Sequence, residues 1–84
     1  MTKVAEDLSV KVELVKDFLA NGDFDDAYKL LDQMSFDDFE SLGAAGEQLL
    51  LVKEVLERRA VAPSAKAKEN HEKQAQKLAA AVVV

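Results

Sequence analysis

An 84-residue chain with 49% apolar residues and no cysteine forms one domain at most, without disulfides or thiolate metal sites. Its formal net charge is −5, and the segment from Asp17 to Glu47 holds nine acids and one base, Lys29. Such a surface repels phosphate backbones and anionic lipid, so we expect binding to neither nucleic acid nor membranes.

The first predicted element is a helix from about Lys3 to Ala20. Apolar residues recur there in alternating steps of four and three, the period of one helix face, at Met1, Ala5, Leu8, Val12, Val15 and Leu19. Val10 and Leu14 widen this face, which predicts contact with two neighbouring helices. Asn21-Gly22 ends the helix, because glycine takes the left-handed conformation without steric cost.

A short second helix follows after a two-residue turn, and it must therefore fold back on the first as an antiparallel hairpin. Asp23 is its expected N-cap, with Asp25 and Asp26 in the first turn, where carboxylates meet free backbone N–H groups. One face of the helix is apolar and is formed by Phe24, Ala27, Tyr28, Leu31 and Met34.

Ser35 is the next expected N-cap, again followed by a phenylalanine and two acids, Phe36-Asp37-Asp38. We interpret the two similar helix starts as one capping solution used twice. Residues 21–31 resemble the turn and second helix of a tetratricopeptide unit. That unit recurs every 34 residues, and Leu56–Pro63, at that spacing, does not repeat it, so we assign no family.

Two arrangements fit the segment that follows. It is either one helix from Phe36 to about Ala60, or a short helix, a break at Gly43–Gly46 and a longer helix. We favour a break or kink, because two glycines inside a helix cost about 2 kcal/mol relative to alanine. Their small size also permits a close approach of two backbones. Pro63 ends this helix, since the residue before a proline is pushed out of the α region.

Ser64 is expected to cap a last helix from Ala65 to about Ala81. Lys68–Glu72 and Glu69–Lys73 are spaced for i,i+4 ion pairs, but apolar residues are sparse before Leu78 and Val82. We find no convincing core-facing stripe in this helix. We therefore divide the chain into a helical core domain, residues 1–62, and a polar helical tail, residues 63–84. The tail is either mobile or becomes ordered on a partner.

The predicted fold is thus all-α, a small three- to four-helix bundle built on the N-terminal hairpin. The N-terminus lacks the apolar stretch of a signal peptide, and no apolar run approaches the roughly 20 residues that span a bilayer. These features predict a cytoplasmic protein.

Catalysis is not expected, because the sequence has no cysteine and its one histidine, His71, lies in the polar C-terminal segment. The acids after Asp23 do not match a calcium-binding loop, since position six is Tyr28 and position twelve is Met34. The three glycines match no phosphate-binding motif. We expect no cofactor and no metal ion.

By elimination, the sequence predicts a protein–protein interaction module: an adaptor, a chaperone-like protein or a small regulator. One alternative is an acidic inhibitor that imitates nucleic acid, and another is a structural protein that forms a homodimer or larger homo-oligomer. A carboxylate mimic would need its acids on one contiguous surface. The candidate partner surface consists of Asp23, Asp25, Asp26, Asp37, Asp38, Glu40, Leu78 and Val82. We also expect that removal of residues 64–84 would leave the hairpin folded.

Overall fold

The computed structural model describes the backbone of residues 2–82 and the side chains of residues 8–82, and this part of the chain is all-α, as predicted. Five helices follow one another: α1 (Thr2–Ala20), α2 (Phe24–Gln33), α3 (Phe36–Ser41), α4 (Ala44–Ala60) and α5 (Ala65–Ala80). None of them is long and apolar enough to cross a membrane.

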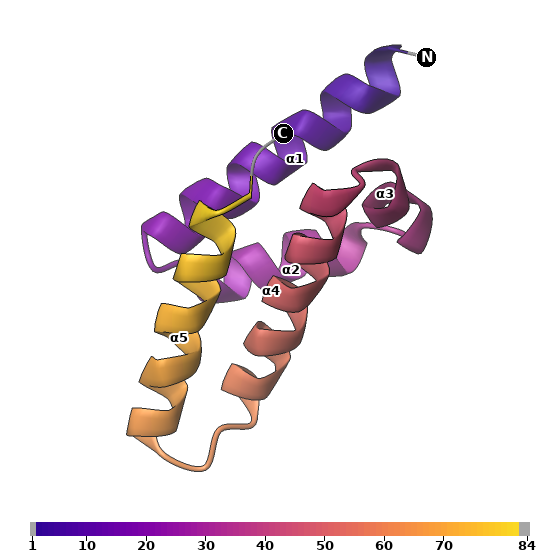
Figure 1. Cartoon of the computed structure of the whole chain (residues 1–84). Coiled ribbons are helices and arrows are strands. Elements are labelled where there is room, and N and C mark those ends of the chain that lie inside the picture. Colours follow the sequence, from indigo (N-terminus) through magenta and orange to yellow (C-terminus); the bar gives the residue numbers. More distant parts are fainter. Residues whose placement is uncertain (1, 83–84) are drawn as a thin grey trace.

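Two helical hairpins pack on each other (Figure 1). In the first, α2 folds back along α1, and in the second, α5 runs back along α4. The short helix α3 links the hairpins and packs against α4, while the C-terminal end of α5 returns to α1. The molecule is elongated, with extents of 45 × 22 × 19 Å.

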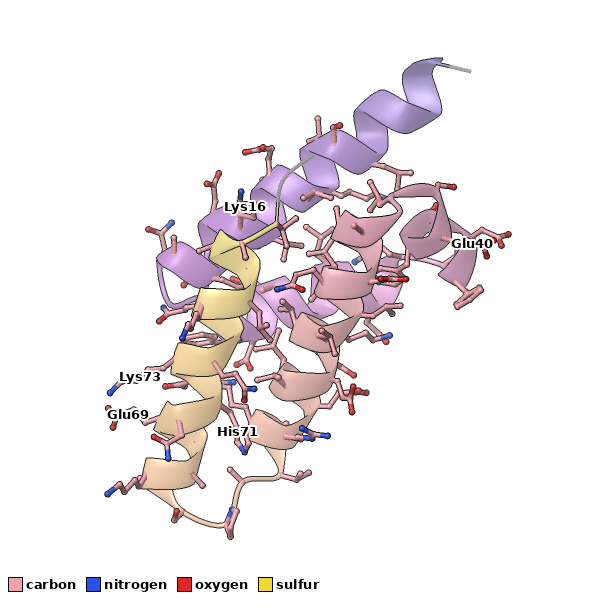
Figure 2. All side chains as sticks on the ribbon, viewed as in Figure 1. Lys16, Glu40, Glu69, His71 and Lys73 are labelled. Carbon is pink, nitrogen blue, oxygen red and sulfur yellow. The ribbon has the colours of Figure 1, made fainter. Side chains whose placement is uncertain are left out.

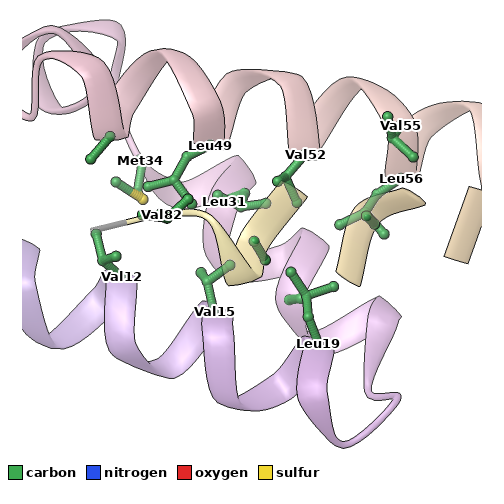
Figure 3. Close-up of a cluster of buried hydrophobic side chains, with 14 of the residues drawn as sticks. Val12, Val15, Leu19, Leu31, Met34, Leu49, Val52, Val55, Leu56 and Val82 are labelled. Carbon is green, nitrogen blue, oxygen red and sulfur yellow. The ribbon is translucent and has the colours of Figure 1, made fainter. Parts of the chain in front are cut away.

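From Leu8 onward, the predicted stripe of α1 forms one wall of the core, where Val12, Val15 and Leu19 are buried. Leu31 from α2 and Leu49 and Val52 from α4 meet them there (Figure 3). The side chains of Met1 and Ala5, the first two predicted members of the stripe, lie outside the described residues.

The widened face of α1 has a mixed outcome. The predicted contact of α1 with two neighbouring helices is confirmed, since α1 packs against α2 and α5. It does not run through Val10 and Leu14, however, because these side chains are 57% and 41% exposed. They point away from the face that the hairpins bury.

Gly22 ends α1 as predicted, in the left-handed region at φ +81°. The N–H groups of Gly22 and Asp23 bond to the carbonyls of Leu19 and Phe18 at 3.2 and 2.7 Å, the pattern of a Schellman motif. This motif holds Asp23 at φ −87° and ψ 64°, outside the extended conformation of a typical N-cap. Asp23 therefore makes no side-chain cap, although it occupies the N-cap position.

Ser35 and Ser64 cap their helices as predicted. The Ser35 hydroxyl accepts from the Asp38 N–H at 3.2 Å, and the Asp38 carboxylate accepts from the Ser35 N–H at 2.9 Å, which completes a capping box. The Ser64 hydroxyl accepts from the Ala67 N–H at 3.1 Å. The last turn of α4 ends at Ala60, before Pro63, as the proline predicts.

The two glycines after α3 have separate roles. The chain breaks at Gly43, which has φ +63°, and α4 begins at the next residue. Gly46 lies inside α4, where a Cβ atom would overlap the carbonyl group of Phe39. The predicted break is thus confirmed at Gly43, and the predicted close approach of two backbones occurs at Gly46, between α3 and α4.

The last helix has a core-facing stripe, contrary to the sequence interpretation. Ala75 and Ala79 are buried on one face of α5, and Val82 is only 1% exposed. The C-terminal part of α5 and the residues that follow it are also hydrogen-bonded to α1. Lys16 Nζ donates to the Val82 carbonyl at 2.7 Å, and Gln76 Nε2 donates to the Leu19 carbonyl at 2.8 Å. Alanine was not recognised as a core residue because its small side chain contributes little apolar surface.

Candidate docking cleft between α3 and α4

An apolar cleft of about 280 Å³ opens at the junction of α3 and α4. Its apolar lining comes from Phe36 and Phe39 on α3 and from Leu50 on α4, and its acidic rim comes from Glu40 and Glu47. Gly43, at the break between the helices, completes the lining and contributes no side chain that would fill the cleft. We call this feature the α3–α4 cleft.

Local interactions fix the orientation of α3 and hence the shape of the cleft. The capping box between Ser35 and Asp38 starts the helix. Met34 and Phe39, the residues on either side of the first turn, are both buried in the core, the arrangement of a hydrophobic staple. At the other end, Gly46 lets α4 approach the Phe39 backbone. Phe39 is buried, whereas Phe36, at the start of the same short helix, remains exposed.

Phe36 is 71% exposed, the most exposed aromatic side chain in the described part of the chain. A phenylalanine on the surface forgoes about 1.5–3 kcal/mol that full burial would contribute. The cap and the staple of α3 use Ser35, Asp38, Met34 and Phe39, so neither requires an aromatic residue at position 36. An exposed aromatic residue beside an apolar cleft is typical of an interaction site.

The rim of the cleft is uniformly negative. Residues 35–47 include four acids and no base. Among the side chains that the structure describes, Asp37, Glu40 and Glu47 form no ion pair, whereas Asp38 is held in the capping box. Glu40 extends away from the bundle at the end of the molecule that carries α3 (Figure 2). The site can therefore attract a positively charged group next to an apolar one.

A second groove, of about 390 Å³, lies between α2 and the C-terminal half of α4. Phe24 and Leu56 contribute to its lining, and charged side chains of both signs surround them. The Arg59 guanidinium carbon lies 4.8 Å from the centroid of the Phe24 ring, and Arg59 pairs with Asp25 at 3.2 Å and Glu72 at 2.8 Å. Arg59 and Asp25 are thus engaged within the fold, whereas Lys29 on the same lining forms no ion pair among the described side chains.

Tyr28 closes the side of this α2–α4 groove. Its hydroxyl donates to Glu57 Oε2 at 3.1 Å across the two helices. This hydrogen bond, together with desolvation and the negative charges of Glu57 and Asp32, raises the pKa of the Tyr28 phenol above its ordinary value of 10.0. Contacts between α2 and α4 therefore lie on both sides of the groove, Tyr28 with Glu57 and Arg59 with Asp25.

The structure divides the predicted acidic surface into two groups. Asp23, Asp25 and Asp26 lie at the start of α2, whereas Asp37, Asp38 and Glu40 lie on α3. The two groups are thus found at opposite ends of α2, a helix of ten residues and about 15 Å. Asp25 is engaged by Arg59 and Asp38 by the capping box. The contiguous carboxylate surface that a nucleic-acid mimic needs is not formed by these six residues.

The two apolar members of the predicted surface have other roles. Leu78 is half-buried and packs on the core, and its carbonyl accepts from Gln48 Nε2 at 3.2 Å. Val82 belongs to the core itself. Val82 is therefore withdrawn from the candidate partner surface, because the return of α5 to α1 buries its side chain.

Sequence reasoning overlooked Phe36, Glu47 and Leu50, which line the cleft with the predicted residue Glu40. In the sequence, Phe36 stands only as part of a capping pattern. Its signal was the i,i+3 spacing of Phe36 and Phe39, which places both side chains on one side of the helix and so indicates a shared apolar site.

No group of three or more His, Asp or Glu side chains in the described residues is arranged to hold a metal ion. No family model, curated protein or solved structure matches the chain.

Proposed function

We propose that this protein is a non-enzymatic protein-binding module whose α3–α4 cleft receives a segment with an apolar anchor flanked by basic residues. The observation that carries the proposal is the 71% exposure of Phe36 beside an apolar cleft with an acidic rim. Binding energy in protein interfaces is concentrated in a few residues, commonly aromatic ones at the centre of a patch. Phe36 has this position, between the apolar floor and the surrounding carboxylates.

Each part of the cleft supports a separate property of the partner. The floor formed by Phe39 and Leu50 favours an apolar side chain, which would cover Phe36 as it enters. Glu40 and Glu47 favour lysine or arginine on either side of that anchor. A short amphipathic helix supplies both features, because its apolar and basic residues lie on adjacent faces. Adaptors, chaperone-like proteins and small regulators all use such contacts.

The test uses the full chain labelled with ¹⁵N and a synthetic amphipathic peptide of leucine and lysine as the probe. We expect salt-sensitive binding that shifts the amide signals of Phe36, Gly43 and Leu50. Phe36→Ala should weaken this binding about tenfold, the loss expected of an interface anchor. The same peptide with glutamate in place of lysine should not bind, because the rim repels it.

Val10→Ala is the matched control, since Val10 is also strongly exposed but lies on α1. It should leave peptide binding unchanged. Shifts confined to other parts of the molecule, or equal binding by the Phe36→Ala variant, would show that the cleft is not the docking site.

A further inference from the structure

We propose that a second copy of this chain is a partner of the cleft. In this arrangement, the turn between α4 and α5 of one molecule docks into the α3–α4 cleft of the next. The inference rests on the proposed function, because it names the segment that supplies the apolar anchor and the basic flanks.

The α4–α5 turn has the apolar side chain that the cleft requires as an anchor. Val61 is 80% exposed, the most exposed of the large apolar side chains in the described residues. Pro63, on the same turn, and Ala65, the first residue of α5, are also exposed. The turn lies at the free end of the α4–α5 hairpin, which extends beyond α2 (Figure 1). A convex apolar tip of this kind can enter a cleft without moving any helix.

The same turn is also flanked by the basic residues that the cleft requires of a partner. Residues 58–68 include four bases and no acid, the opposite of the composition of residues 35–47. Arg59 is already engaged by Glu72 and Asp25. Lys66 and Lys68 are exposed and form no ion pair among the described side chains. Arg58 pairs only with the exposed Glu54 on its own helix, at 3.0 Å. Arg58 thus lies at the end of α4, and Lys66 and Lys68 lie in the first turn of α5, on either side of the turn that carries Val61.

The cleft and the tip cannot meet within one molecule. Gly43 and Glu47 place the cleft at the start of α4, whereas Val61 follows its last residue. The 17 residues of α4 separate them by about 25 Å. Contact between two different surfaces of the same chain is a heterologous interface, and such interfaces produce open chains unless the rotation closes a ring. Small interfaces of this type are weak, so assembly should depend on concentration and salt.

The experiment measures mass by sedimentation equilibrium and light scattering across a range of concentrations. At low ionic strength, the average mass of the unmodified chain should rise above 9.2 kDa with concentration and return to it in high salt. Phe36→Asp blocks the cleft and Val61→Asp blocks the tip, so each variant alone should remain a monomer. Both positions are exposed, and circular dichroism checks that both variants stay folded.

An equimolar mixture of the two variants provides the decisive result. One intact tip and one intact cleft remain, so the mixture should form a dimer of about twice 9.2 kDa and nothing larger. A dimer formed by either variant alone would place the contact elsewhere, for example at Val10 and Leu14, and would overturn the proposal. So would a mixture that stays monomeric at the highest concentration.

The peptide separates this inference from the proposed function. If the unmodified chain is always a monomer but its cleft binds the leucine–lysine peptide, only the second copy is excluded and a foreign partner remains. If the peptide fails to bind and the mixture also stays monomeric, the cleft itself is not a docking site. A third variant, with Lys66→Glu and Lys68→Glu, should lose self-association but retain peptide binding.

Discussion

Arg59 donates a hydrogen bond from Nε to Oε2 of Glu72 at 2.8 Å, which joins the last turn of α4 to α5. Both side chains are partly buried. Its guanidinium also stacks on the Phe24 ring and bonds to Asp25, both at the start of α2. One side chain therefore connects three helices. The i,i+4 spacing had suggested Lys68 as the partner of Glu72, but the fold gives Glu72 a better one, since charge-assisted bonds to the planar arginine fork are stronger.

Replacement of Arg59 by alanine should lower the free energy of unfolding by about 2 kcal/mol, because a charge-assisted hydrogen bond and a cation–π contact are lost. Arg59→Lys should recover only part of this loss, because an ammonium group cannot reproduce the fork that reaches both carboxylates. Urea denaturation provides the measurement.

Arg58→Ala is the control for this comparison. Arg58 precedes Arg59 in the sequence, but its ion pair with Glu54 is exposed and lies within one helix. Such pairs contribute about 0.3–0.5 kcal/mol. Equal effects of the two substitutions would mean that Arg59 does not join the helices.

Gly46→Ala should destabilise the protein by about 3 kcal/mol, the upper part of the range for overpacking, because the new Cβ would overlap the Phe39 backbone. Helix propensity alone predicts the opposite sign, a gain of about 1 kcal/mol, since Gly46 lies inside α4. Thermal denaturation followed by circular dichroism decides between them. A raised melting temperature would contradict the close approach of α3 and α4.

The packing of α5 against the core can be tested by substituting one buried and one exposed alanine of this helix. Ala75→Leu should cost about 1–3 kcal/mol, because Ala75 is fully buried between helices. Ala80→Leu should change stability by less than about 0.5 kcal/mol, because Ala80 is exposed. Urea denaturation of both variants measures the difference. Identical stabilities would support the mobile tail that the sequence suggested.

Removal of residues 64–84 also tests whether α5 is part of the core. It would take Ala75, Ala79 and Val82 from the core and expose the faces of α1 and α4 that they cover. From this packing we now expect the truncated chain to lose cooperative unfolding, in place of the folded hairpin that the sequence suggested. A sharp urea transition in the truncated chain would favour the original expectation.

Tyr28 is the only tyrosine, so its ionisation can be followed directly by ultraviolet absorbance. We expect it to titrate above pH 10, because Glu57 accepts its proton in a hydrogen bond and repels the phenolate. The fold favours the neutral phenol. This contribution to stability is therefore complete below pH 10 and is lost as the pH rises through the raised pKa.

Glu57→Ala should lower the pKa of Tyr28 toward 10, since it removes the largest cause of the shift. Glu54→Ala removes a carboxylate from the same helix that does not contact Tyr28 and should leave the titration unchanged. If both variants titrate like the unmodified protein, the bond between α2 and α4 does not form in solution.

The sequence by itself determined the features that depend on neighbouring residues. The turn at Gly22, the caps at Ser35 and Ser64 and the end of α4 before Pro63 are set within a few residues of chain. Helical periodicity likewise identified the buried stripe of α1. These local signals were sufficient to predict the all-α class.

Tertiary structure decided what depends on residues far apart in the chain. Arg59 and Asp25 are 34 positions apart, and no local pattern pairs them. Ala75 and Ala79 are core residues only because α4 lies against them, and alanine gives too weak an apolar signal to reveal this. In the same way, Phe36 is part of a candidate site only because α3 packs on α4 through Gly46, which brings Phe36 and Phe39 to the same cleft as Leu50.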